Sequence, residues 1–253
     1  MRNYAVELEN RVRFIREVLA ETGAEGIVYG NSGGKDSALV GILCKKACDN
    51  TLGIMLPCGS KRNYGEDKAD AQQVAQQFDI SLRTVDLTES KQILMAGLSQ
   101  AVSLSESAAA NIAPRLRMTT LYAIAASENR LVAGTGNRSE AHMGYFTKWG
   151  DGAYDFNPIA DLTVTEIFDF LRFLKAPSSI IDKAPSAGLF EGQTDETEMG
   201  ISYRSIDDFL LNGIAEESAR EVIDSFHNSS AHKRQLPIVY KNSAAEEPGD
   251  KKP

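Results

Sequence analysis

The octapeptide Gly30–Ser37 (GNSGGKDS) constrains this chain more than any other stretch. It follows a short apolar run, Ile27–Tyr29, and precedes an amphipathic segment that extends from Ser37 to Cys48. This order predicts a strand, a tight glycine turn and a helix. The first turn of a helix offers unpaired backbone N–H groups and the positive end of the helix dipole. Because glycines keep side chains out of the approach, we expect this loop to bind phosphate groups.

The residue after the lysine separates this loop from the Walker A motif, which needs Ser or Thr there to reach magnesium. Here Lys35 is followed by Asp36, and three residues lie between Gly30 and Gly34. A carboxylate beside a phosphate site would repel the ligand unless a cation lay between them. Asp36 therefore indicates a bound magnesium ion, which carboxylate and phosphate oxygens can share. The alternative is an ordinary glycine turn with a helix cap, and the strand and helix signals on both sides make it the weaker interpretation.

Composition and charge exclude several classes of function. The 253 residues are 42% hydrophobic and 25% charged, which is typical of a soluble globular protein. A net charge of −8 argues against broad nucleic-acid binding, which needs a basic face. No apolar run approaches the length of about 18 residues that a membrane span needs, and the N-terminus lacks a secretory signal. With three cysteines, an odd number, a cytoplasmic protein is the simplest interpretation.

Apolar periodicity predicts strands that alternate with helices through the first half of the chain. Strands are expected at Ile27–Tyr29, Leu52–Leu56, Ser81–Leu87 and Leu131–Thr135, and helices at about 4–19, 37–48, 66–78, 89–104 and 111–129. This alternation predicts an α/β fold with a doubly wound parallel sheet and flanking helices. Beyond residue 150 we expect a helical C-terminal part, with helices at about 164–174, 203–211 and 215–227 and a long loop over 184–200.

Two glycine turns are expected to meet at one edge of this sheet. In doubly wound sheets, ligands bind beyond the carboxyl ends of the strands, where the strand order reverses. The glycine loop follows the first predicted strand, and the turn Gly134–Gly136 follows the fourth. We therefore expect one shared site that both turns help to build.

Further motifs are each weak signals alone, but in their order along the chain, together with the glycine loop, they form a strong one. They are Arg115-x-Arg117, Gly134-Thr135-Gly136-Asn137-x-x-Glu140, Gly144–Lys148, Gly150-Asp151-Gly152-x-x-Asp155, Pro185–Leu189, Gln193–Tyr203 and His232-Lys233-Arg234. The glycine loop resembles the pyrophosphate loop of the ATP pyrophosphatases (the PP-loop superfamily), and the ordered series resembles ammonia-dependent NAD synthetase. The resemblance implies an adenine nucleotide alpha-hydrolase-like fold, one domain over residues 1–234, a polar tail over 235–253 and a homodimer.

The resemblance implies a ligase reaction in two steps. The nicotinate carboxylate of nicotinic acid adenine dinucleotide attacks the α-phosphorus of ATP and releases pyrophosphate. Ammonia then attacks the adenylated carboxyl group, which gives NAD and AMP. The expected partners are therefore the dinucleotide, ATP as co-substrate and ammonia, with Mg²⁺ as the cofactor and neither nucleic acid nor a membrane. The task of the protein is to position the reactants and to neutralise charge on the phosphates.

The resemblance also assigns roles to individual residues. Asp36 and Glu140 are expected to bind magnesium and, with Lys35, to serve catalysis, although Glu140 could instead form a surface salt bridge. The residues expected to bind ATP are Gly30, Ser32, Gly33, Gly34, Ser37, Thr135 and Ser186. The residues expected to bind the nicotinic acid dinucleotide are Arg115, Lys148, Asp155, His232 and Lys233, with His232 and Lys233 approaching it across a dimer interface. Taken alone, His232 is an exposed histidine near the end of the chain.

One position departs from the family pattern. Family members usually carry a lysine that contacts ATP phosphate two residues after the position of Leu162, and this chain has Val164 there. The lost charge should weaken the neutralisation of phosphate. Many relatives have an apolar residue at the position of Lys35, so we hypothesise that Lys35 substitutes for the missing lysine.

The nitrogen source is expected to be free ammonia or ammonia from a separate protein. About 26 residues precede the first predicted strand, whereas a glutamine-hydrolysing domain needs at least about 50. Two alternatives remain open. One is another ATP pyrophosphatase that adenylates a different acceptor or transfers sulfur to RNA, for which Cys58 is a candidate thiol. The other is a non-catalytic nucleotide-binding module, which Val164 suggests.

Overall fold

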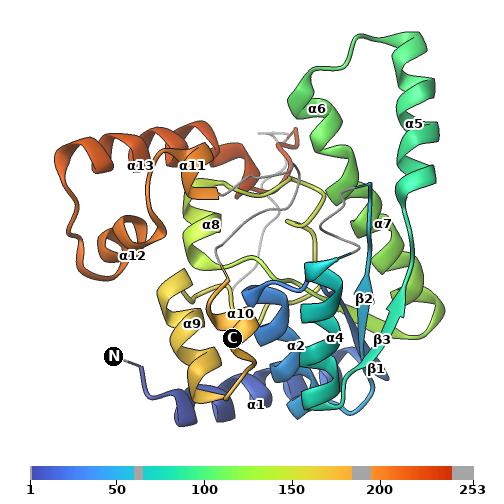
Figure 1. Cartoon of the computed structure of the whole chain (residues 1–253), viewed down its shortest axis with the longest axis vertical. Coiled ribbons are helices and arrows are strands. Elements are labelled where there is room, and N and C mark those ends of the chain that lie inside the picture. The colour runs from blue at the N-terminus through green and yellow to red at the C-terminus, as the bar shows by residue number, and fades with distance from the viewer. Residues whose placement is uncertain (1, 60–64, 184–194, 241–253) are drawn as a thin grey trace, which may run out of the picture.

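A parallel sheet lies at the centre of the computed structural model, which describes residues 2–59, 65–183 and 195–240 (Figure 1). Its strands are β1 (Gly26–Gly30), β2 (Thr51–Met55), β3 (Ser81–Thr84) and β4 (Arg130–Ala133), in the spatial order β3-β2-β1-β4. Val28 of β1 is paired with Leu52 of β2 on one side and with Val132 of β4 on the other. The predicted doubly wound parallel sheet is confirmed, and its strand order reverses between β1 and β4.

Alternate residues of the strands face two different layers of helices. Ile27 and Tyr29 pack with the layer that contains α1 (Tyr4–Thr22), α2 (Lys35–Ala47), α4 (Glu66–Phe78), α9 (Val164–Phe173) and α10 (Ser178–Ile181). Val28 packs on the opposite face with α7 (Ile112–Ser127), and α5 (Thr88–Ala101) and α6 (Glu106–Ala110) extend beyond it (Figure 1). Both faces of β1 are therefore buried, which explains why the strand reads as an unbroken apolar run.

The remaining helices form a separate layer beside the sheet, at the left of Figure 1. They are α8 (Arg138–Met143), α11 (Asp195–Met199), α12 (Tyr203–Asn212) and α13 (Glu217–Ser229), followed by the 3₁₀ turn η1 (Ala231–Lys233). Their shared core contains Met143, Tyr203, Ile206 and Ile223, and Val164 at the start of α9 joins it. The predicted helical C-terminal part is thus confirmed.

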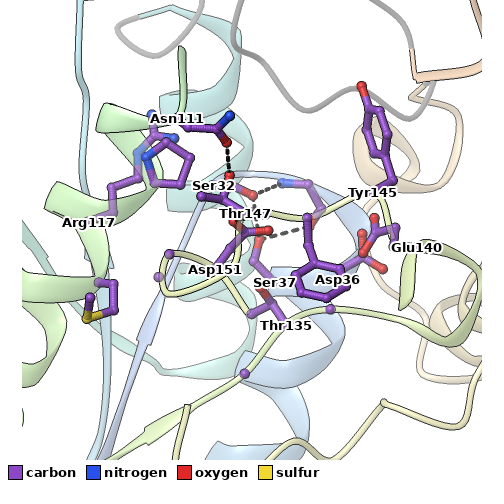
Figure 2. Close-up of a pocket in the computed structure, with 18 of the residues that line it drawn as sticks. Ser32, Asp36, Ser37, Asn111, Arg117, Thr135, Glu140, Tyr145, Thr147 and Asp151 are labelled. Carbon is purple, nitrogen blue, oxygen red and sulfur yellow. Dashed lines mark hydrogen bonds between the residues drawn. The ribbon is translucent and has the colours of Figure 1, made fainter. Parts of the chain in front are cut away.

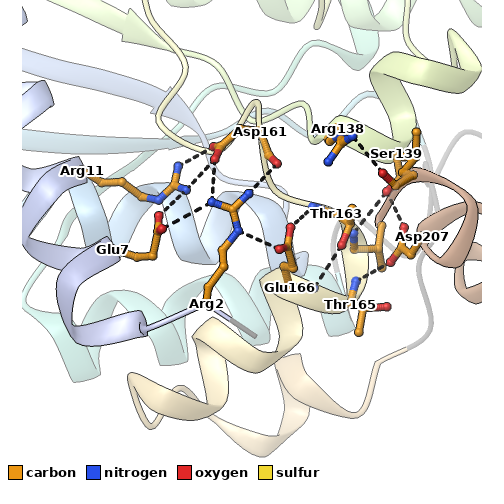
Figure 3. A network of polar contacts seen from close by, with 12 residues as sticks. Arg2, Glu7, Arg11, Arg138, Ser139, Asp161, Thr163, Thr165, Glu166 and Asp207 are labelled. Carbon is orange, nitrogen blue, oxygen red and sulfur yellow. Dashed lines mark hydrogen bonds and ion pairs between the residues drawn. The ribbon is translucent and has the colours of Figure 1, made fainter. Parts of the chain in front are cut away.

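Ion pairs fix the N-terminal helix to the segment that precedes α9 (Figure 3). Arg11 of α1 is 8% exposed and contacts both carboxylate oxygens of Asp161, at 2.7 and 2.9 Å. Arg2 contacts Glu166 at 2.7 Å, and Glu166 also caps α9 through the backbone N–H of Thr163. The bidentate Arg11–Asp161 pair holds a defined geometry, and together with the Arg2–Glu166 contact it helps to set the position of α9.

Several element boundaries differ from the sequence-based prediction. The third strand ends at Thr84 rather than Leu87, and the helix expected to run to about 104 ends at Ala101. The loop expected over 184–200 contains the short helix α11 from Asp195, while residues 184–194 lie outside the described residues. No helix among the described residues combines the length and apolar character needed to cross a membrane.

Candidate active site

The glycine loop connects β1 to α2 in a conformation that only glycine adopts easily. Gly33 has a φ of +73°, and a Cβ at this position would come within 2.1 Å of the backbone oxygen of Asp67 at the start of α4. Gly34 is the N-cap of α2, and its N–H donates to Ser32 Oγ at 3.3 Å. The hydroxyl groups of Ser32 and Ser37 lie 3.2 Å apart. Hydroxyl and backbone donors therefore converge at the N-terminus of a helix, which is an arrangement that binds anions.

Asn31 adds a donor to this loop that the sequence-based assignment did not include. Its side chain is 5% exposed, and its Oδ1 accepts from the N–H of Gly33 at 3.2 Å. Its buried Nδ2 has no hydrogen-bond partner among the described residues. A buried donor without a partner is costly, and a phosphate oxygen in the adjoining cavity would satisfy it.

Both glycine turns line one cavity of about 940 Å³. From the first turn it is lined by Gly30, Asn31, Ser32 and Gly34, and from the turn after β4 by Gly134, Thr135 and Gly136. The cavity thus opens beyond the carboxyl ends of β1 and β4, where the strand order reverses. This is the place where ligands bind in doubly wound sheets.

Asp36 and Glu140 lie on the same side of this cavity, opposite Arg117 and Asn111 (Figure 2). The side chain of Asn137 links them, because its Nδ2 donates to Asp36 Oδ1 at 3.0 Å and its Oδ1 accepts from the N–H of Glu140 at 2.9 Å. Glu140 completes a capping box by accepting from the N–H of Asn137 at 3.1 Å. Burial, followed by the neighbouring charge of Asp36, raises the pKa of Glu140 to about 8. Two carboxylates are therefore held together at a site that favours an added cation.

This donor set fits magnesium rather than a metal held by protein ligands alone. Among the described residues, no group of three or more His, Cys, Asp or Glu side chains is placed to hold a metal ion. Magnesium is usually bound through one or two carboxylates and completes its shell with water and substrate phosphate. Asp36 and Glu140, beside the glycine loop, fit this pattern.

Lys35 lies in the acidic part of the cavity, which is the part lined by Asp36, Glu140 and Asp195. Its Nζ contacts Asp36 Oδ2 at 2.8 Å and lies 5.6 Å from the centre of the Tyr203 ring. The Tyr203 hydroxyl donates to Asp195, which is 3% exposed and also lines the cavity. Desolvation lowers the pKa of Lys35, but the charges of Asp36, Glu140 and Asp195 outweigh it, so the pKa of Lys35 is raised.

Val164, at the position where the family pattern has a lysine, carries no polar function in this structure. It is 3% exposed and packs in the apolar cluster that contains Tyr203. The ammonium of Lys35 lies over the same Tyr203 ring. A lysine charge is therefore present in this region, although it comes from α2 rather than from α9.

The residues expected to bind the nicotinic acid dinucleotide divide into two groups. Lys233 lines the cavity, and its Nζ donates to the backbone oxygens of Gly144 and Phe146, both at 2.8 Å. Arg115, Lys148 and His232 lie outside the lining and form a chain of contacts: Arg115 donates to the Lys148 oxygen at 3.3 Å, and Lys148 Nζ donates to the His232 oxygen at 2.6 Å.

Asp155 is also outside the cavity lining. Its carboxylate accepts from the N–H of Val132 at 2.7 Å and from the Tyr122 hydroxyl at 3.2 Å, so it caps the edge of β4. Asp151, four residues earlier, lines the cavity instead and accepts from the N–H of Thr147 at 3.0 Å. Ser186 lies outside the described residues.

The sequence-based assignment gave no binding role to two cationic residues of the lining, although one of them, Arg117, belongs to the Arg115-x-Arg117 motif. Arg117 on α7 lines the cavity and donates to the Leu56 oxygen at 3.1 Å, whereas Arg115 is exposed. Residues two apart point away from each other on a helix, so the periodicity of α7 was the signal that could have separated them. Lys183 is held by Asp67 and Asp70 at 2.8 and 2.6 Å, beside the glycine loop.

Cys58, the candidate thiol for sulfur transfer, is not placed for that chemistry. It is 5% exposed, and its Sγ contacts the Leu87 oxygen at 3.7 Å. Burial raises the pKa of Cys58, which lowers the fraction of the reactive thiolate. The sulfur-transfer alternative therefore has no support at this position.

Comparisons with known proteins match nearly the whole chain. The family model described as NAD synthase matches residues 7–241. The NH(3)-dependent NAD(+) synthetase of Carboxydothermus hydrogenoformans is 47% identical over 94% of this chain and 98% of its own length. The corresponding protein of Alkaliphilus metalliredigens is 42% identical over 92% of this chain and 97% of its own.

Solved structures of similar proteins also cover nearly the whole chain. The structure of NMN synthetase from Francisella tularensis has a TM-score of 0.90 and 36% identity, and the match covers 96% of this chain and 100% of that one. An NH3-dependent NAD synthetase from Campylobacter jejuni has a TM-score of 0.76 and 29% identity, over 95% of this chain and 100% of that one. The curated relatives are ligases, and the chain belongs to the NAD synthase family.

Proposed function

We propose that this chain catalyses the ATP-dependent amidation of nicotinic acid adenine dinucleotide by ammonia, with NAD, AMP and pyrophosphate as products. The observation that carries the proposal is the meeting of Asp36 and Glu140, through Asn137, at the phosphate-binding loop of a single cavity. The names of the relatives at 42–47% identity support the choice of this reaction over another ATP pyrophosphatase chemistry.

The residues of the cavity suit the activation of a carboxylate by ATP. The N–H groups and hydroxyls of the glycine loop hold the phosphates, and Asp36 and Glu140 would hold magnesium. Held by these two residues, magnesium would supply positive charge that offsets the negative charge of the departing pyrophosphate. The acceptor carboxylate bonds to the α-phosphorus as the bond to the bridging oxygen breaks. Ammonia then bonds to the acyl carbon, AMP leaves, and the nitrogen loses a proton to give the amide.

We propose binding roles for the other predicted residues in the same way. For ATP these are Gly30, Ser32, Gly33, Gly34, Ser37, Thr135 and Ser186, to which Asn31 is added because of its unpaired donor. On the acceptor side, Lys233 contacts the substrate directly from the cavity lining of its own chain, while Arg115, Lys148, Asp155 and His232 act from positions outside that lining. Lys35 supplies the positive charge that Val164 cannot.

A second candidate acceptor is the shorter nicotinic acid mononucleotide. It is favoured by one observation, the TM-score of 0.90 to the NMN synthetase of Francisella tularensis, which exceeds the 0.76 to the NAD synthetase of Campylobacter jejuni. Both acceptors present the same nicotinate carboxylate to ATP, so the chemistry is unchanged and the difference lies in the second nucleotide.

The acceptor is tested by incubating the protein with ATP, magnesium, ammonium and one acceptor at a time. We expect AMP to form with the dinucleotide, at a higher kcat/KM than with the mononucleotide, and ammonium to support far more turnover than glutamine. A higher kcat/KM with the mononucleotide would assign the second candidate. Formation of AMP with neither acceptor would reject both.

A homodimer and a cytoplasmic location complete the proposal. The dimer is supported by α5, which has no buried residue and exposes Ile93 and Leu94 at 66% and 41%. The three cysteines, Cys44, Cys48 and Cys58, are free thiols, which suits the reducing cytoplasm.

A further inference from the structure

Lys35 occupies the place beside Asp36 where a bound cation would be expected. Its side chain is 6% exposed, and its Nζ lies 2.8 Å from Asp36 Oδ2. Asn137 donates to the other oxygen, Oδ1, at 3.0 Å. Both oxygens of an expected metal ligand are therefore engaged within the protein. Each keeps a further lone pair, but a divalent ion on Oδ2 would lie next to the ammonium.

The ammonium is held by charge in addition to its contact with Asp36. Asp195, which is 3% exposed, also attracts it, and the face of the Tyr203 ring lies 5.6 Å away. A lysine has a flexible stem of four carbons and three rotatable donors. Its head group can therefore change partner when the distribution of charge around it changes.

ATP would change that distribution. Lys35 follows Gly34, the N-cap of α2, so its side chain starts at the loop that holds the phosphates. A triphosphate bound there adds several negative charges within reach of the ammonium. The phosphates then attract the Lys35 ammonium more strongly than the carboxylates do.

We propose that Lys35 is a resident counter-cation, which holds Asp36 in the nucleotide-free protein and turns to the phosphates when ATP binds, so that magnesium binds tightly only together with ATP. The inference rests on the proposed roles of Asp36 and Glu140. Lys35 is then a positioning residue that couples the binding of Mg²⁺ to the binding of ATP. Such coupling is reciprocal, so each ligand raises the affinity for the other by the same factor.

Removal of the Lys35 charge should allow magnesium to bind tightly without ATP. In Lys35→Met the carboxylates lose their internal cation, so the nucleotide-free protein should bind Mg²⁺ at least about tenfold more tightly than the wild type. A unit charge within a few Å of an ion, at protein-like dielectric, changes binding by more than a decade. A purely structural role for Lys35 would leave Mg²⁺ binding unchanged or weaker.

The test is calorimetric titration of MgCl₂ into the nucleotide-free full-length chain. Lys45→Met is the matched control, because Lys45 lies on the same helix and also contacts two aspartates, Asp49 at 3.5 Å and Asp79 at 3.3 Å. It should bind Mg²⁺ as the wild type does. The double variant K35M/D36N should lose the gain. Lys35→Gln, which keeps a polar side chain, replaces K35M if circular dichroism shows that K35M is unfolded.

The proposal fails if K35M and K35Q bind Mg²⁺ no more tightly than the wild type. It also fails if the gain in Mg²⁺ affinity persists in K35M/D36N. This titration contains no acceptor substrate and does not depend on turnover. A failure to make NAD would therefore reject the proposed function and leave the Mg²⁺ result to be judged separately.

Discussion

At the residue scale, neighbouring residues build one wall of the cavity, and residues far apart in the chain build the rest. Ser32, Gly33, Gly34 and Ser37 form the glycine loop within a few residues of chain, between β1 and α2. Asp151 lines the cavity while Asp155 caps β4, because of how the segment after Gly150 lies against that strand.

Glu140 should make the stability of the free protein fall as the pH rises. Its pKa is about 8 in the folded chain against 4.5 when exposed, so between these values the folded protein binds the extra proton. Stability is then lost progressively from about pH 4.5 to 8. In magnesium-free buffer, the free energy of unfolding should fall between pH 6 and pH 9 by more than about 1 kcal/mol less in Glu140→Gln than in the wild type. Urea denaturation at pH 6 and pH 9 measures it.

Glu166 provides the matched control for that variant. It completes the same kind of capping box on α9 but pairs with Arg2, outside the acidic part of the cavity. Glu166→Gln should keep the pH slope of the wild type. If E140Q and E166Q show the same slope as the wild type, Glu140 is not held in its protonated form.

Gly33 should not tolerate a side chain. Gly33→Ala would place a methyl group 2.1 Å from the Asp67 backbone oxygen at a φ of +73°. We expect a loss of more than about 1 kcal/mol of stability and weaker ATP binding, because the loop must open to relieve the clash. Gly97→Ala is the control, since nothing lies within 4 Å of that site on α5 and alanine favours a helix. An ATP affinity in G33A equal to that in G97A would contradict the expected geometry.

At the scale of elements, apolar periodicity identified the strands and the long helices. It missed α8 and α11, which have 6 and 5 residues, too few for a periodic signal. Yet α8 carries Glu140 and α11 carries Asp195. Short helices of this kind are fixed by tertiary contacts, so their residues entered the site only through the resemblance or the structure.

The contact between α8 and α12 should set the position of Glu140. Buried Asp207 accepts from Ser139 Oγ at 2.5 Å and from the N–H of Thr165 at 2.7 Å, as Figure 3 shows. Ser139→Ala removes one donor from a buried carboxylate, which should cost about 1–3 kcal/mol. It should also raise the KM for ATP·Mg²⁺ as α8 loosens. Chemical denaturation and steady-state kinetics measure these effects.

The neighbouring residue Asp208 separates this contact from a general effect of charge on α12. Asp208 is exposed on the same helix. Asp208→Asn should change stability by less than about 0.5 kcal/mol and leave the KM unchanged. If S139A and D208N behave alike, the buried contact does not position α8.

At the scale of the whole molecule, the predicted doubly wound sheet indicated the edge at which the cavity lies, because few topologies satisfy such a sheet. Association between chains has no such signature in the sequence. The exposed apolar side chains of α5 became visible only in the structure.

Light scattering should find a particle of twice the 27.5 kDa chain mass. Ile93→Glu should shift it to monomer, because it places a charge in the apolar face of α5. Ile214→Glu is the control, since Ile214 is equally exposed at 67% but lies between α12 and α13. A wild-type monomer, or a dimer that I93E leaves intact, would reject α5 as the interface.

Transfer of an oxygen atom tests the proposed activation of the carboxylate most directly. The protein is incubated with ATP, magnesium, ammonium and nicotinic acid adenine dinucleotide that carries ¹⁸O in its nicotinate carboxylate, and the products are analysed by mass spectrometry. We predict AMP with one ¹⁸O atom, unlabelled pyrophosphate, and NAD that keeps the other labelled oxygen in its amide. Label in pyrophosphate or inorganic phosphate, or AMP without label, would contradict attack of the carboxylate on the α-phosphorus.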